Sequence, residues 1–401
     1  MSAPPDHREP PILAGVRERF EQSTDLTIGI EEEYQLLDPR THALVNRFEE
    51  VHQAADEALR AQLAGELISS EIEFRTLPHA TFASAARDLV EGRLALGALA
   101  DRLGLALGIS GVHAFSDWRD QRIIDTEHYR RVKDELGYIA WTNNTWAIHV
   151  HCGVRGADRA IAVVTAIRSV LPELLALSAN SAVFVGRLTG LHSTRTQIFT
   201  RSFPRCGVPD PLTGWEEYAD YVRFLDRTHS IVESTQIWHS VRPHHAYGTV
   251  ELRICDGQTE MGEALGLAAL MVACVAAFLR DHDDGRPLPA HPHRLIEENV
   301  WRAQRDGVTG RLIDLDRAEE RPAAAAIEAL LRWSESVHAP LGLEPFLASI
   351  PATLAAGNGA VRQIALFRER PDPAAVQAHV AERTRKSAEE VMERMGAVLP
   401  A

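Results

Sequence analysis

Cysteine is scarce in this chain, which has four cysteines among 401 residues. Cys152, Cys206, Cys255 and Cys274 form no CxxC pair and no Cys/His spacing typical of zinc ligands. This pattern argues against a disulfide-stapled fold and favours a reduced, cytoplasmic setting. We expect Cys152 to be a small core residue rather than a nucleophile.

Three common catalytic motifs are also missing. The sequence contains no GxxxxGK[ST] loop, no GxGxxG after an expected strand and no GxSxG. A nucleotide site built on a P-loop or a Rossmann turn therefore has no support, and neither does serine-hydrolase chemistry.

Positive charge is in deficit. The chain has 42 Lys and Arg against 56 Asp and Glu, a net charge of −14. A net negative charge of this size argues against nucleic-acid binding as the main function. It is still compatible with a local basic pocket.

Long apolar runs are missing as well. The most apolar stretch, residues 264–279, is about sixteen residues long, short of the roughly twenty that span a membrane, so we expect a buried helix and no membrane. The first residues, MSAPPDHREPP, are rich in proline and charge and lack the apolar core of a signal peptide. We therefore expect a disordered tail over residues 1–22.

The rest of the chain, residues 23–401, is expected to form a single domain with a helical C-terminal portion. It shows no internal repeat, no long linker and no low-complexity block. Apolar spacing of three to four residues predicts helices, and residues 109–115 are expected to form a strand. The predicted helices cover residues 80–107, 156–177, 294–304, 323–336 and 374–395. The fold class that fits best is α+β, with an antiparallel sheet covered by helices.

Four short alternating segments carry the chemistry. Because successive strand residues point to opposite faces, each segment sets two polar side chains on one face and apolar neighbours on the other. The four pairs are Glu31 with Glu33, Glu71 with Glu73, His149 with His151, and Glu251 with Arg253. Clustered carboxylates repel one another, and a hard divalent cation is the simplest remedy. The pattern therefore predicts a metal site that binds a polyanion.

Each segment has a simpler explanation. The glutamates could line a solvated sheet face, the histidines could be structural, and Glu251 with Arg253 could form a cross-face salt bridge. Glu66 differs in parity from Glu73, so both reach one site only if a bend or bulge follows Glu66. Arg187 and Arg195 are candidates for anion contacts, because guanidinium groups match phosphate and carboxylate oxygens, or they are solvated surface groups.

Several segments in order resemble one family. The motifs are GIEEEYQLLDP at residues 29–39, HVHCGV at 149–154, GRLTG at 186–190, GTVELRICD at 248–256, ENVWRA at 298–303 and GNGAVRQ at 357–363. Over roughly residues 25–370 they are similar to the type 2 glutamate–cysteine ligase family. Within it, the chain resembles the carboxylate-amine ligase branch, described as having weak glutamate–cysteine ligase activity.

The resemblance implies a fold related to the glutamine synthetase catalytic domain, in which an antiparallel sheet forms a curved funnel. It also implies ATP-dependent, ADP-forming ligation through an acyl phosphate, with Mg²⁺ or Mn²⁺ on the nucleotide phosphates. The implied metal ligands are Glu31, Glu33, Glu66, Glu73, His149 and Glu251. Arg253 would stabilise the transferring phosphoryl group beside the catalytic Glu251, and Arg187 and Arg195 would help to bind the nucleotide. The expected partners are a carboxylate such as glutamate, an amine and a second copy of the chain.

The loop from Asn180 to Gly190 departs from the family pattern. Val185 and Leu188 stand where relatives more often have an aromatic residue and a carboxylate, so we expect an amine acceptor less polar or bulkier than cysteine. The alternative is that this loop packs only against the core or another subunit. Two other functions stay open: a metal-dependent hydrolase using His149 and His151, and a non-catalytic nucleotide-binding relative.

Overall fold

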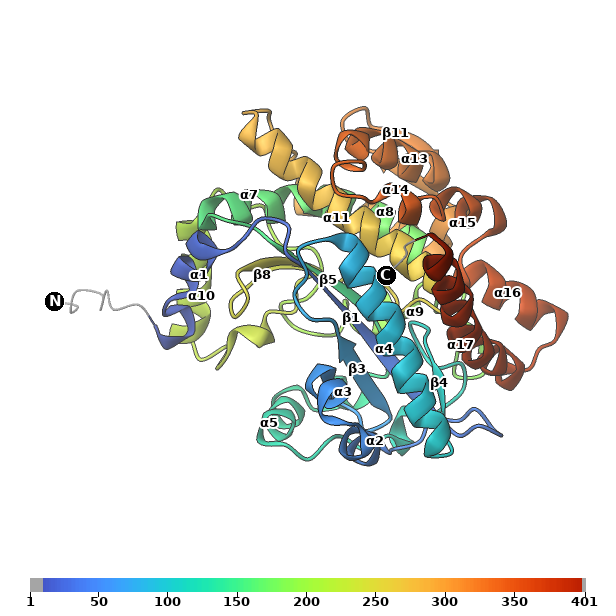
Figure 1. The fold of residues 1–401 in the computed structure, drawn as a ribbon. Coiled ribbons are helices and arrows are strands. Elements are labelled where there is room, and N and C mark those ends of the chain that lie inside the picture. The colour runs from blue at the N-terminus through green and yellow to red at the C-terminus, as the bar shows by residue number, and fades with distance from the viewer. Residues whose placement is uncertain (1–9, 399–401) are drawn as a thin grey trace.

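The computed structural model describes residues 10–398 and is built on a seven-stranded antiparallel sheet. The strands follow the order β2-β3-β1-β5-β9-β8, and β4 pairs with β1. The central strand β1 carries the first acidic pair (Figure 1). The strands are β1 (Ile28–Leu37), β2 (Leu63–Ala64), β3 (Glu71–Arg75), β4 (Ala106–Gly108), β5 (Ile148–Gly153), β8 (Val241–His244) and β9 (Thr249–Leu252).

Helices cover the apolar face of this sheet. Helix α4 crosses β1 and β3, and α11 packs against β5 (Figure 1). The main helices are α1 (Val16–Gln22), α2 (Phe48–Ala54), α3 (Glu57–Gln62), α4 (Phe82–Arg102), α5 (Glu127–Leu136), α6 (Tyr138–Thr142), α7 (Ala157–Ile167), α8 (Leu171–Ser178), α9 (Thr194–Ile198), α10 (Trp215–Arg227), α11 (Met261–Asp283), α12 (His293–Asp306), α13 (Ala323–Ser334), α14 (Glu344–Leu347), α15 (Ile350–Ala356), α16 (Gly359–Glu369) and α17 (Pro373–Val398). Two small hairpins complete the fold: β6 (Val183–Phe184) with β7 (Arg187–Leu188), and β10 (Arg311–Asp314) with β11 (Glu319–Pro322).

Two helical segments are long and apolar enough to cross a membrane. They are Ala157–Ser178 and Met261–Asp283, and 83% and 89% of their apolar windows are buried inside the protein. The expectation of a buried helix over residues 264–279 is therefore confirmed, because α11 is the central core helix. Cys152 also lies in the core, with Val150 and Ile148, as expected.

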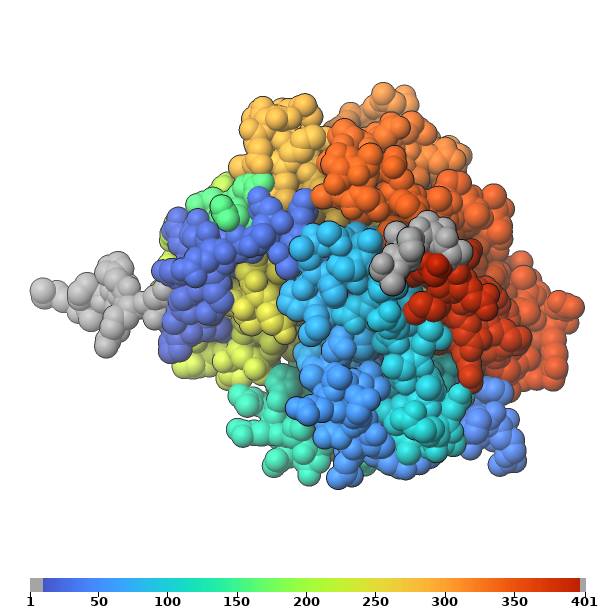
Figure 2. Space-filling model, viewed as in Figure 1, coloured from blue at the N-terminus to red at the C-terminus, as the bar shows by residue number. Residues whose placement is uncertain are grey.

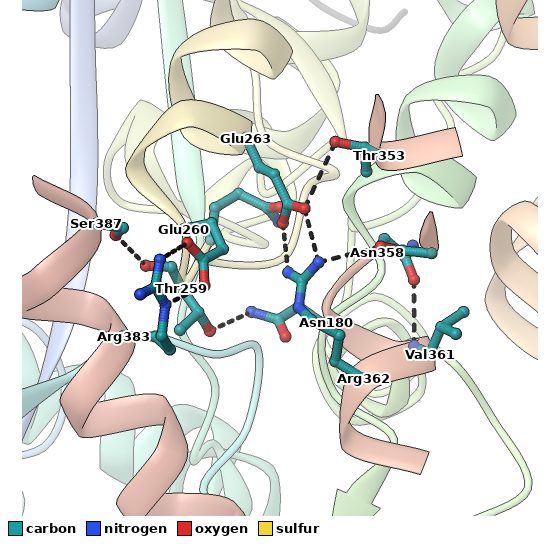
Figure 3. Close-up of polar contacts among 12 residues, drawn as sticks. Asn180, Thr259, Glu260, Glu263, Thr353, Asn358, Val361, Arg362, Arg383 and Ser387 are labelled. Carbon is teal, nitrogen blue, oxygen red and sulfur yellow. Dashed lines mark hydrogen bonds and ion pairs between the residues drawn. The ribbon is translucent and has the colours of Figure 1, made fainter. Parts of the chain in front are cut away.

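The C-terminal helices are clamped to the start of α11. Arg383 of α17 donates to both carboxylate oxygens of Glu260 at 2.8 Å, and Arg362 of α16 donates to those of Glu263 at 2.7 and 2.6 Å (Figure 3). Helix α17 also lies beside α4, and the two share one face of the molecule (Figure 2). Ala388, Val391 and Met395 of α17 belong to the same apolar core as the sheet, and a single domain over residues 23–401 stays a prediction.

Two sequence expectations are wrong. Residues 11–22 are not a tail: they form a 3-10 turn (Pro11–Leu13) and α1, and Phe20 is buried against Trp215 at 5.9 Å between ring centroids. Residues 1–9 of the predicted tail lie outside the described residues. Residues 109–115 do not form a strand. Gly111 instead donates its N–H to the carbonyl of Asn180 and accepts from the N–H of Trp146. The strand nearby, β4, occupies the end of the predicted helix 80–107.

Candidate functional site

The strand register gathers the predicted polar side chains on the sheet face opposite the core. Glu33 pairs with Glu73, Glu31 with His149, and His151 with Glu251. Their donor atoms form three overlapping groups, each with atoms within 4.8 Å of one another. The groups are Glu31, Glu73 and His149; Glu31, His151 and Glu251; and Glu33, Glu66 and Glu73. We call this set the acid cluster. It contains every predicted metal ligand and also His151.

Glu31 lies between the two histidines. Its Oε2 is 3.3 Å from His149 Nδ1, and its Oε1 is 3.3 Å from His151 Nε2. Burial alone would raise the pKa of Glu31, but His151 and His149 outweigh it and hold that pKa well below its usual value. Glu31 is therefore ionised at neutral pH, as a metal-binding carboxylate must be.

Around Glu66, Glu71 and Glu73, the carboxylates outnumber the positively charged groups nearby. Burial and the neighbouring Glu33 raise the pKa of Glu66 to about 8. Burial and nearby carboxylates also raise the pKa values of Glu71 and Glu73 well above their usual range. A cation would relieve this repulsion, because it favours the ionised form of every carboxylate around it.

Glu71 was paired with Glu73 by strand alternation but was not among the predicted ligands. The structure places it in the same electrostatic group, because Glu33, Glu66 and Glu73 all raise its pKa. Its strand parity was the signal that could have added it to the site.

The pKa values of the two histidines shift in opposite directions. Burial and Arg253 lower the pKa of His149, so its imidazole is neutral, which is the form that binds metals. Burial would also lower the pKa of His151, but Glu31 and Glu251 reverse this and raise it. The Nδ1 of His151 lies 2.9 Å from Thr249 Oγ1. Among residues 10–398, the buried Nε2 atoms of both histidines lack a hydrogen-bond partner.

Glu251 is enclosed by two arginines. Arg242 Nε donates to its Oε2 at 2.6 Å, and Arg253 Nη1 donates to its Oε1. Burial would raise the pKa of Glu251, but Arg242 and Arg253 hold it well below its usual value. The salt bridge between Glu251 and Arg253, which was the simpler explanation of this segment, is therefore present. It does not replace the acid cluster, because Glu251 also belongs to that cluster.

The other two predicted arginines lie in different settings. Arg195 is buried and donates to the backbone carbonyls of Ile254 at 3.1 Å and Arg253 at 3.2 Å, so it supports the chain beneath Arg253. Arg187 is exposed on β7 and makes no ion pair within the described part of the chain. Neither guanidinium belongs to the acid cluster, and their role in nucleotide binding stays a prediction.

The loop from Asn180 to Gly190 packs against the core at one of its two unusual positions. Leu188 joins an apolar cluster with Val183, Ala114 and Val376, while Val185 is 54% exposed. For Leu188 the structure thus favours the alternative, packing against the core, over a wall of the substrate site.

Two features of the site were missed in the sequence. His244, the last residue of β8, and Tyr247, from the turn that follows, stack with ring centroids 4.4 Å apart and lie 5.1 and 5.6 Å from the His151 ring. On the opposite face of β1, Glu32 binds Arg93 through both oxygens, at 2.5 and 3.2 Å, and accepts from Tyr34 at 2.7 Å. This buried network ties β1 to α4 behind the acid cluster.

A model of glutamate-cysteine ligase family 2 matches residues 27–390. The chain belongs to this family. The predicted family is thereby confirmed. One relative is "Putative glutamate--cysteine ligase 2-2" of Rubrobacter xylanophilus. It is 36% identical over 359 residues, which cover 90% of this chain and 91% of the relative. Another from the same organism, "Putative glutamate--cysteine ligase 2-3", is 38% identical over 367 residues, or 91% and 99% of the two chains.

Solved structures share the fold at low sequence identity. Glutamate–cysteine ligase from Francisella tularensis, in complex with AMP, is 12% identical with a TM-score of 0.66, covering 93% of each chain. A bifunctional glutathione synthetase from Pasteurella multocida is 13% identical with a TM-score of 0.67, covering 94% of this chain and 54% of the other. The α+β fold class, with helices over an antiparallel sheet, is confirmed.

Proposed function

We propose that this glutamate-cysteine ligase family member is an ATP-dependent carboxylate–amine ligase that forms ADP and an acyl phosphate. The observation that carries the proposal is the acid cluster, where three overlapping groups of oxygen and imidazole donors lie beside Arg253. Oxygen-rich sites of this kind suit Mg²⁺, which commonly bridges nucleotide phosphates.

The donor set fits a divalent cation. The carboxylates outnumber the nearby positive charges, and the buried Nε2 atoms of His149 and His151 make no hydrogen bond among the described residues, although Glu31 Oε1 lies 3.3 Å from His151 Nε2. Glu31, Glu33, Glu66, Glu73, His149 and Glu251 would hold Mg²⁺ or Mn²⁺. When bound, the cations neutralise phosphate charge and orient the terminal phosphoryl group.

Arg253 would act on the phosphoryl group directly. Its guanidinium pairs with Glu251, and its buried Nε has no hydrogen-bond partner within residues 10–398. A guanidinium that donates to the transferring phosphoryl oxygens stabilises their developing charge. Arg242 binds both oxygens of Glu251, Nε to Oε2 at 2.6 Å and Nη2 to Oε1 at 3.3 Å, so Glu251 would stay in place if Arg253 donated to a phosphate instead.

The names of the relatives support a choice of substrates. Their names point to glutamate as the carboxylate and cysteine as the amine, and the Francisella tularensis protein was solved with AMP. We propose that the γ-carboxylate of glutamate attacks the terminal phosphate of ATP and that cysteine or another amine then displaces phosphate. A cytoplasmic setting and a homodimer are part of the same proposal.

The test is a turnover assay with Mg²⁺-ATP, glutamate and a panel of amines, in which ADP, phosphate and amide product are measured. We expect amine-dependent ADP and phosphate, lost in Glu251→Gln and retained in Glu91→Gln, whose side chain is exposed on α4. No amide product and no ATP cleavage with any amine would instead favour a hydrolase. Nucleotide binding without ADP would indicate a non-catalytic relative.

A further inference from the structure

Helix α5 lies over the sheet face that carries the acid cluster, whereas α4 and α11 cover the opposite face (Figure 1). Leu37 of β1 has the same strand parity as Glu31, so its side chain points to the acid face. It shares an apolar cluster with Val132 of α5. Burial, and after it four nearby carboxylates led by Glu66, raise the pKa of Tyr129, which places this α5 side chain close to the acid cluster.

The helix fills the gap between the two edges of the sheet. Strands β2 and β8 are the ends of the strand order. Tyr129 of α5 donates to the carbonyl of Gly65, the residue after β2, at 2.6 Å. On its other side α5 contacts a 3-10 turn, Ser234–Gln236, which Arg242 of β8 holds by donating to the carbonyl of Thr235 at 3.2 Å. Six flat strands would be about 24 Å wide, and a helix is about 10–12 Å across. The sheet therefore curves around α5.

The side of α5 that faces β2 is apolar and buried. Tyr129, Val132 and Leu136 recur every three or four residues, as one face of a helix requires. They pack in the apolar cluster that contains Ile68 and Trp146, and Val132 is 6% exposed. Because burial of apolar surface is the main stabilising term in folding, this side of the helix is firmly attached.

The side of α5 that faces β8 is polar and open to water. His128 Nδ1 lies 2.7 Å from Glu233 Oε1, and the two side chains are 42% and 37% exposed. Two turns further along the helix, Glu135 accepts from Gln236 Nε2 at 2.5 Å and lies 3.4 Å from Arg205 Nη2. Exposed ion pairs contribute little to stability, so these contacts break far more easily than the apolar ones on the other side.

The acid cluster is closed to solvent in this arrangement. Its side chains Glu31, Glu33, His149, His151 and Glu251 are at most 14% exposed. A nucleotide must touch these donors to bind, so an element that covers them has to move first. Helix α5 is attached firmly at one edge and weakly at the other, which suits it to that movement.

We infer that α5 is a gate over the acid cluster, hinged on its apolar contacts beside β2 and latched beside β8 by His128 and Glu135. Opening breaks only the latch contacts, and closing excludes water from the site. Gly137 follows α5 with φ at 53°, a left-handed conformation that glycine adopts readily, so the chain can turn there into α6. The inference rests on the proposed function only in taking Mg²⁺-ATP as the ligand that enters.

The first test locks the latch and needs no nucleotide. His128→Cys and Glu233→Cys are combined, and the disulfide is verified by mass spectrometry. Diethyl pyrocarbonate, which acylates neutral imidazoles, then reports opening. His149 should react at least about tenfold more slowly in the oxidised protein than in the reduced and alkylated protein, because a minor open state admits the reagent. The exposed His229 should react equally in both, and each single-cysteine variant should match the unlocked protein.

The second test follows the binding of a fluorescent N-methylanthraniloyl-ATP with Mg²⁺ by stopped flow. Locking should slow both association and dissociation at least about tenfold, since a closed gate bars passage in both directions. Glu135→Ala removes two latch contacts and should speed both rates about two- to fivefold. The matched control is Glu127→Ala on the same helix, which should change neither rate. The Glu127 carboxylate is 90% exposed and pairs only within α5, with Arg131 at 3.7 Å.

The gate and the proposed function fail separately. If locking protects His149 but the unlocked protein binds no Mg²⁺-ATP, the gate stands and the proposed function is wrong. If Mg²⁺-ATP binds and locking changes neither its rates nor the reaction of His149, the gate is overturned and the proposed function stands. Should the two cysteines fail to join, Glu135→Ala decides: faster modification of His149 than in the wild type supports the gate, and an unchanged rate overturns it.

Discussion

Replacing Glu66 with glutamine should make the metal-free protein more stable. The pKa of Glu66 rises from an ordinary 4.5 to about 8 in the fold, first through burial and then through Glu33. A carboxyl group whose pKa is higher in the folded than in the unfolded protein stabilises the fold fully when the pH is below its unfolded pKa, and this stabilisation is lost as the pH rises through its folded pKa. The free-energy cost of burying ionised Glu66 is therefore absent near pH 4.5 and complete above pH 8.

The size of the effect follows from the pKa change. Each unit of pKa corresponds to about 1.4 kcal/mol, so the upper bound is about 5 kcal/mol. Glu66 is half-buried and shares its environment with Glu33 and Glu73, so we reduce this figure to about 2–3 kcal/mol. Glu66→Gln should exceed the wild type by that amount at pH 8.5 and by little at pH 5.

The assay is urea unfolding at both pH values, first with EDTA and then with Mg²⁺. Mg²⁺ binds the folded state alone and should stabilise the wild type more than Glu66→Gln, because the variant lacks one ligand. Glu91→Gln, exposed on α4, should match the wild type throughout. A Glu66→Gln protein that is less stable at pH 8.5, or that gains as much from Mg²⁺ as the wild type, would refute the reasoning.

Three further predictions concern groups outside the acid cluster. Glu32→Ala leaves buried Arg93 unpaired and should cost about 3–5 kcal/mol in unfolding free energy, whereas Glu32→Met with Arg93→Met should cost much less; equal losses would contradict this. Glu173→Gln should add about 2–3 kcal/mol at pH 8 and nothing near pH 4.5, since burial raises the pKa of Glu173 to about 7; a pH-independent difference would argue against it. Leu188→Asp should destabilise by about 1–3 kcal/mol through its apolar cluster, while Val185→Trp should stay within about 0.5 kcal/mol; the reverse order would restore the loop as a substrate wall.

Strand alternation predicted most of the site. The polar face of β1, β5 and β9 follows from a period of two residues, so Glu31, His149 and Glu251 could be assigned to polar strand faces from the amino-acid sequence. Residues far apart in sequence met because antiparallel strands bring the same faces into register. The family motifs agreed with this placement.

Features that depend on tertiary packing could not be predicted from local pattern. Glu66 lies between β2 and β3, where the path of a loop decides which way a side chain points. The pair of Glu32 and Arg93 joins residues 61 positions apart. The segment around Phe20 resembled a disordered tail because it follows a stretch rich in proline and charge. Its few apolar residues are buried only through tertiary contacts such as that of Phe20 with Trp215.

The central claim, ligation through an acyl phosphate, is tested most directly by oxygen transfer. Glutamate labelled with ¹⁸O in its γ-carboxylate is incubated with Mg²⁺-ATP and an amine that supports turnover, and the phosphate is analysed by mass spectrometry. An acyl phosphate gives up one carboxylate oxygen when the amine displaces phosphate, so one labelled oxygen should appear in phosphate for each amide formed. Label in AMP, or phosphate without label, would contradict the account.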